Sequence, residues 1–102
     1  MAEAPQLADQ PGDVAAIVAL VLESLPAAEW SRLKVKHPTD DDGVWFFWLP
    51  GRPGEVQMDW TSTSGLCPFI VETDKCNDRY TGATPEDVAQ KIVEWLTLPG
   101  GR

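Results

Sequence analysis

Residues 44–61 read VWFFWLPGRPGEVQMDWT and carry the clearest hairpin signal of the chain. The first six residues are all aromatic or aliphatic, which is typical of a β-strand with apolar side chains on both faces. The segment 50–54 holds two prolines and two glycines, as tight turns do. After it, Val56, Met58 and Trp60 alternate with polar residues, which is the period of a strand with one buried face. We therefore expect two antiparallel strands joined by a turn.

Two further strands are predicted on either side of this hairpin. In residues 30–37 (WSRLKVKH), apolar and basic side chains alternate, as in a half-buried strand. Residues 66–73 (LCPFIVET) form a fourth strand by composition. Pro68 has no N–H group to donate to a sheet, so it indicates an edge strand or a bulge. Residues 74–83 (DKCNDRYTGA) are polar and are expected to form a loop.

Helices are predicted at both ends of the chain. Residues 14–25 (VAAIVALVLESL) place apolar side chains at helical spacing after Asp13, a suitable N-cap. Near the C-terminus, Thr84 is a suitable N-cap and Pro85 suits the first helical position. The apolar residues that follow recur at helical spacing until the next proline.

The order of elements is helix, four strands, helix, and the short connections between strands imply an antiparallel meander. The predicted class is α+β, a four-stranded antiparallel sheet flanked by an N-terminal and a C-terminal helix (α-β-β-β-β-α). Residues 1–12 contain prolines, a glycine and no periodicity, so we expect a flexible N-terminal tail. Residues 13–99 are expected to form a single domain.

A hypothesis about strand register follows from the turn. Placing Leu49 opposite Glu55 gives a hairpin with one wholly apolar face, which we expect to be the core face. It carries Val44, Phe46, Trp48, Val56, Met58 and Trp60, with Leu33 and Val35 from the first strand.

The opposite face of this predicted sheet is the candidate binding surface. It combines a basic row, an aromatic row and a mainly acidic row, which are Arg32, Lys34 and Lys36, then Trp45, Phe47 and Leu49, then Glu55, Gln57 and Asp59. Aromatic residues are enriched at interface hot spots, so we predict that this surface binds a partner. The predicted binding residues are Trp45, Phe47, Leu49, Lys34, Lys36 and Asp59. Two other interpretations remain: basic side chains that merely cover the rings, and a helix that packs on this face.

Composition limits the classes of partner and site. Among 102 residues there are 16 acids and 8 bases, a formal net charge of −8. This charge disfavours nucleic-acid backbones and anionic membranes, and no apolar run approaches the roughly 20 residues that cross a bilayer. A cytoplasmic location is the expectation. Cys67 and Cys76 are then expected to be unpaired thiols. Because the sequence has no CxxC or HxxxH spacing, we expect no metal site, and we expect no other cofactor.

The sequence alone does not specify a function. The preferred hypothesis is a small acidic, non-catalytic protein-binding module, such as an inhibitor or a bacterial immunity-type protein. Its negative charge favours a basic protein as partner. The alternative is a ligand-binding or cysteine-dependent enzyme domain with a site near the 74–83 loop, made of Cys67, Cys76, Asp74, Arg79 and Tyr80. A DNA mimic is a third option, and the three bases on the first predicted strand count against it.

Overall fold

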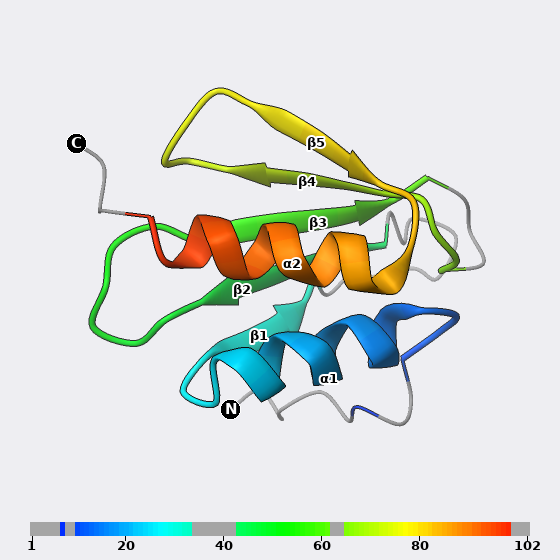
Figure 1. Cartoon of the computed structure of the whole chain (residues 1–102), viewed down its shortest axis with the longest axis horizontal. Coiled ribbons are helices and arrows are strands. Elements are labelled where there is room, and N and C mark those ends of the chain that lie inside the picture. Colours follow the sequence, from blue (N-terminus) through cyan, green and yellow to red (C-terminus); the bar gives the residue numbers. More distant parts are fainter. Residues whose placement is uncertain (1–6, 8–9, 34–42, 62–64, 99–102) are drawn as a thin grey trace.

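The chain forms a five-stranded antiparallel meander with two helices, in a computed structural model that describes residues 7, 10–33, 43–61 and 65–98 (Figure 1). The elements in chain order are α1 (Val14–Ser24), β1 (Glu29–Arg32), β2 (Val44–Trp48), β3 (Val56–Trp60), β4 (Phe69–Thr73), β5 (Arg79–Gly82) and α2 (Pro85–Leu96). The strands lie in sequence order across the sheet. The α+β class, the meander and the two flanking helices are confirmed. The predicted number of strands is wrong by one.

The additional strand, β5, lies inside the segment expected to be a polar loop. It has four residues, of which Arg79 and Thr81 are exposed while Tyr80 is half-buried and Gly82 is buried. Such a short alternation is hard to distinguish from a polar turn by sequence. Because β5 pairs with β4, β4 is not an edge strand, which was one of the two alternatives that Pro68 indicated. Pro68 directly precedes β4, where its missing N–H removes no interior sheet hydrogen bond.

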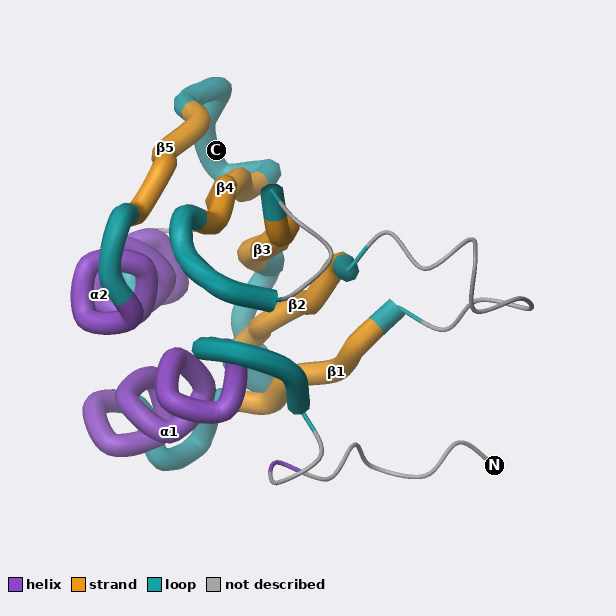
Figure 2. The backbone as a smooth tube through the Cα atoms, turned by 90° about the vertical axis from the view of Figure 1, so that its right-hand side faces the viewer, coloured by secondary structure: helices purple, strands orange, loops and turns teal. Residues whose placement is uncertain are grey.

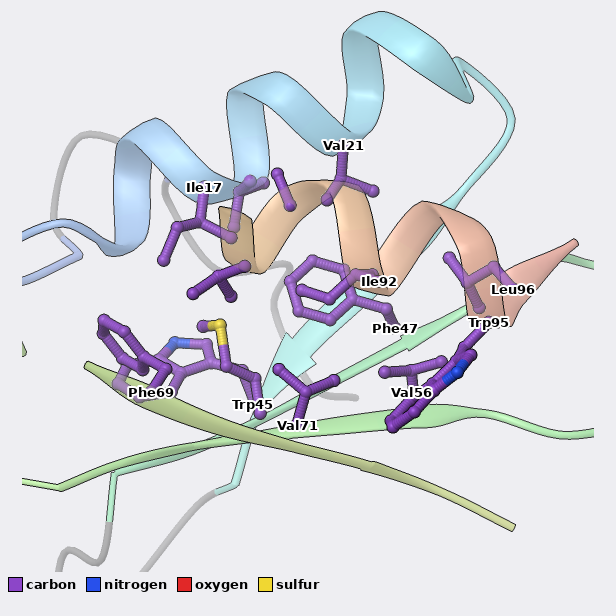
Figure 3. Close-up of a cluster of buried hydrophobic side chains, with 14 of the residues drawn as sticks. Ile17, Val21, Trp45, Phe47, Val56, Phe69, Val71, Ile92, Trp95 and Leu96 are labelled. Carbon is purple, nitrogen blue, oxygen red and sulfur yellow. The ribbon is translucent and has the colours of Figure 1, made fainter. Parts of the chain in front are cut away.

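Both helices pack on the same side of the sheet, so the molecule has one helical layer and one sheet layer (Figure 2). Between the layers, side chains of α1, α2, β2, β3 and β4 form one apolar core (Figure 3). The fully buried members larger than valine are Ile17, Trp45, Phe47, Met58, Phe69, Ile92 and Leu96. Helix α1 packs against both the core and α2, which accounts for the large apolar surface of α1.

The two helices begin at the predicted caps. The Thr84 side chain accepts a hydrogen bond from the Asp87 backbone N–H at 3.1 Å, as an N-cap does. Asp13 is the N-cap residue of α1, but its carboxylate makes no capping bond within the helix. Asp13 Oδ2 instead accepts from the Cys67 N–H at 2.9 Å, so it joins the start of α1 to the segment before β4.

The register predicted for β2 is wrong. Trp45 pairs with Met58 and Phe47 pairs with Val56, whereas the sequence hypothesis paired Phe46 and Trp48 with those residues. A shift of one residue moves every side chain of a strand to the other face. Residues of β3 keep their predicted faces, so the reversal is confined to β2 and β1.

The first strand also differs from its prediction. It ends at Arg32, and Trp30 and Arg32 pair with Phe47 and Trp45. Leu33 lies beyond the strand and is exposed. The rest of the predicted strand, including Lys34, Val35 and Lys36, lies outside the described residues.

One glycine fixes the observed β2–β3 register. Gly43 has a φ of +62°, and its carbonyl accepts from the Trp60 N–H at 3.0 Å. A Cβ at this position would lie 2.0 Å from Trp60 Cε2, so only glycine allows the indole to pack there. The contact holds Trp60 opposite Gly43 and therefore Met58 opposite Trp45.

The two central phenylalanines of β2 test this register. Phe47→Ala should lower the free energy of unfolding by about 3–5 kcal/mol, because it leaves a cavity in the core. Phe46→Ala, on the half-buried face, should cost less than about half of that. Urea denaturation followed by circular dichroism measures both values. Equal losses, or a larger loss for Phe46→Ala, would contradict the register.

Candidate functional site

The predicted binding residues do not share one surface. Trp45 and Phe47 are 0% and 1% exposed, so the prediction that they form an exposed patch is wrong. Leu49 is half-buried and packs against the same core. Asp59 lies on the opposite sheet face, where Gln57 Nε2 donates to its Oδ1 at 3.0 Å.

Both the indole N–H group and the ring face of Trp45 contact other residues of the chain. Its indole Nε1–H donates to Gln10 Oε1 at 2.8 Å, which satisfies the group inside the fold. The Arg32 guanidinium carbon lies 4.9 Å from the centroid of the Trp45 ring and 5.6 Å from that of Trp60. A basic side chain thus does cover an aromatic ring, as one interpretation expected, but on the helix-side face.

The strongest candidate surface is the sheet face opposite the helices, which we call the open face. Its apolar residues are half-buried, and no described helix covers them (Figure 2). They are Val44, Phe46, Trp48 and Ile70. Half-buried aromatic side chains on an uncovered sheet face are characteristic of interaction surfaces. The predicted row of Trp45, Phe47 and Leu49 lies on the face that the helices cover, and the uncovered row consists of the alternate residues of β2.

Trp48 is held in a fixed orientation on this face. It lies directly across from Glu29 on β1, and its Nε1–H donates to Glu29 Oε1 at 3.1 Å. A hydrogen bond to a carboxylate is stronger than a neutral one. This bond orients the indole on the open face.

A shallow hollow of about 520 Å³ lies on the open face, and we call it the sheet hollow. It is lined by Ser31, Phe46, Trp48, Arg52, Gly54, Glu55 and Asp74. A smaller depression of about 120 Å³ shares Glu55 and Asp74 with it and extends toward Glu72. Aromatic and acidic side chains thus line one continuous surface.

Hydrogen bonds between two turns build the acidic wall of the sheet hollow. Asp74 Oδ1 accepts from the Glu55 N–H at 3.2 Å, and Thr73 Oγ1 donates to the Glu55 carbonyl at 2.9 Å. Gly54 has a φ of +89°, and a Cβ there would lie 2.7 Å from Lys75 Cε and 3.1 Å from Asp74 Oδ1. Glycine therefore allows the turns to approach closely enough to place Glu55 beside Asp74.

Lys75 directs its charge away from this wall. Its ammonium donates to the carbonyls of Trp95, Leu96 and Leu98 at 3.2, 3.1 and 3.1 Å, which completes the C-terminal end of α2. Desolvation lowers the pKa of Lys75, the nearby Arg52 lowers it further, and Asp74 acts in the opposite direction.

The open face is consequently rich in carboxylates. Arg79 Nε pairs with Glu72 Oε2 at 2.9 Å near the β5 edge. Within the described residues, no ion pair joins Glu55 or Asp74 to a base. Two carboxylates and the single guanidinium of Arg52 line the sheet hollow beside Phe46 and Trp48, so its described lining carries a net negative charge.

The residues of the alternative site near 74–83 do not converge. Arg79 lies on the open face, while the Tyr80 hydroxyl donates to Asp87 on α2 on the helix side. Cys67 and Cys76 flank opposite ends of β4, which spans about 17 Å, and neither forms a disulfide. Burial raises the pKa of Cys67 to about 11, helped by the hydrogen bond and charge of Asp13 and by the charges of Glu86 and Asp87.

Among the described residues, no group of histidine, cysteine and carboxylate side chains is arranged to hold a metal ion. No helix in the described ranges is long and apolar enough to cross a membrane. Comparisons with protein-family models, curated proteins and solved structures found no match to this chain.

The reactivity of the Cys67 thiol tests whether the charge of Asp13 raises the pKa of Cys67. Asp13→Asn keeps an oxygen that accepts from the Cys67 N–H but removes the negative charge. The variant should lower the pKa of Cys67 and speed its alkylation by iodoacetamide at about pH 8.5. Mass spectrometry of labelled peptides measures the rate, with Cys76 as the internal comparison. An unchanged Cys67 rate would contradict the role assigned to Asp13.

The same pKa predicts how stability depends on pH. The folded pKa of Cys67 is about 11 against an ordinary value of 9.0, so folding favours the protonated thiol. Its contribution to stability is fully present below pH 9.0 and is lost as the pH rises toward 11. Between pH 9.0 and 11, the free energy of unfolding should therefore fall less for the Cys67→Ser variant than for the native chain. Urea denaturation at a series of pH values measures both changes.

Proposed function

We propose that this protein is a non-catalytic binding module whose open face binds a basic partner protein. The observation that carries the proposal is the placement of Phe46 and Trp48 on an uncovered sheet face beside Glu55 and Asp74. It combines the two components of a specific protein surface, namely aromatic groups that supply affinity and charge that selects the partner.

The aromatic residues support binding through burial. Phe46 and Trp48 each retain apolar surface that a partner would remove from water. Because Glu29 already orients the indole, Trp48 is preorganised, which reduces the entropy lost on association. Half-buried rings on a rigid sheet also make a flat platform that changes little on binding.

The charge of the open face supports a basic partner. Carboxylates of Glu29, Glu55 and Asp74 border the aromatic residues, and the whole chain carries a net charge of −8. Such a field raises the rate of encounter with a positively charged protein and disfavours acidic ones. An inhibitor or immunity-type protein would act in this way by covering a basic functional surface of its target.

The geometry favours this role over a cysteine-dependent enzyme. A thiol whose pKa is raised to about 11 is almost entirely protonated at neutral pH and is a weak nucleophile. Tyr80 and Arg79 point to opposite sides of the sheet, so they do not complete a site with either cysteine.

A double variant tests the proposed binding surface. Phe46→Ala/Trp48→Ala should remain folded but fail to retain basic proteins from a lysate of the cells that make this protein. Retention by the native chain should fall as the salt concentration rises from about 0.05 to 0.5 M, because charge attraction is screened. Affinity capture with mass spectrometry measures retention, and circular dichroism checks the fold.

The matched control removes apolar surface elsewhere. Leu20→Ala/Val93→Ala changes a separate hollow of about 190 Å³ between the helices and should leave retention unchanged. Equal retention by the Phe46/Trp48 variant, or equal loss in the control, would refute the open face as the binding surface.

A further inference from the structure

We propose that the sheet hollow binds an arginine side chain of the partner protein, an inference that rests on the proposed function of the open face. The hollow joins aromatic rings of β2 to carboxylates that come from two turns. A guanidinium is the common side chain that is both planar enough to stack on a ring and able to donate several hydrogen bonds to carboxylates.

The aromatic side of the hollow suits a planar cation. Phe46 and Trp48 are alternate residues of β2, so both side chains project from the same face. Rings at this spacing are about 7 Å apart along a strand, which allows a guanidinium to stack on one ring while its methylene stem contacts the other. Trp48 is the stronger cation–π partner of the two.

The acidic side of the hollow provides the opposite charge. Asp74 uses Oδ1 to accept from the Glu55 N–H, and the second oxygen of the same carboxylate can accept from a guanidinium. The Glu55 side chain lines the same hollow. Because the two turns are hydrogen-bonded to each other, these carboxylates are placed before a ligand arrives.

Arg52 also borders the hollow, and its position gives the inference a specific test. Its Nη2 donates to the Leu98 carbonyl at 3.4 Å, at the C-terminal end of α2. The guanidinium is thus engaged outside the acidic wall, but its charge still opposes a second cation nearby. Removing this charge should therefore strengthen the binding of an arginine side chain.

The experiment uses arginine with both backbone ends capped as the probe. N-acetyl-arginine methylamide is titrated into the isotope-labelled full chain, and NMR chemical shifts are recorded. The expected result is a saturable shift at the Trp48 indole N–H and at the Gly54 and Glu55 amides. The citrulline analogue, which has the same shape but no charge, should give no saturable shift, and the lysine analogue should bind at least about threefold more weakly.

Variants of the full chain then separate charge from general packing. Glu55→Gln/Asp74→Asn should weaken arginine binding about tenfold or more, while Arg52→Gln should strengthen it. The control Glu23→Gln/Glu86→Gln removes two carboxylates from the hollow between the helices and should have no effect. The inference would be overturned if Glu55→Gln/Asp74→Asn left the affinity for the arginine probe unchanged. It would also be overturned if the citrulline or lysine analogue gave chemical-shift changes equal to those of the arginine probe.

The outcomes also distinguish this inference from the proposed function. If basic proteins are retained through Phe46 and Trp48 but the arginine probe does not bind the hollow, the inference fails and the proposed function stands. If neither binds, both fail. Concentration-dependent dimerisation in sedimentation experiments, with the hollow residues protected in the dimer, would identify a second copy of this chain as the occupant and would overturn the arginine assignment.

Discussion

The two-residue period of β2 is the constraint on which the rest of the structure depends. Both faces of this strand are apolar, so whichever side chains enter the core leave another apolar set outside. Trp45 and Phe47 enter, and the helices close over them. Phe46 and Trp48 are then left on the other side of the sheet. The candidate surface is a direct consequence of burying its neighbours.

The sequence predicted most elements because their signals are local. Thr84 and Pro85 marked the start of α2, and alternation in β3 assigned Val56 and Met58 to the core. The face of β2 was not predictable from alternation, because all its residues are apolar. The available signal was Gly43, whose missing side chain admits the Trp60 ring. That contact is tertiary, so a pattern of hydrophobic residues does not reveal it.

The negative potential of the open face depends on where the basic side chains lie. Lys75 contacts carbonyls at the end of α2, and Arg32 stacks on Trp45 at the helix-side face. Lys91 lies 4.7 Å from the Tyr80 ring centroid and 5.5 Å from that of Trp95. These cations lie on the helix-side face, and Arg52, whose Nη2 donates to the Leu98 carbonyl, is the base that lines the sheet hollow together with Glu55 and Asp74.

Lys75 has a consequence for motion as well as for charge. Its ammonium joins the last turn of α2 to the chain directly after Asp74, and Asp74 is bonded to Glu55. Hydrogen bonds thus connect the end of the helix, the turn after β4 and the wall of the sheet hollow, and we expect segments connected in this way to open together. We therefore expect a molecule that immobilises Asp74 on one side of the sheet to reduce fraying of the helix end on the other side.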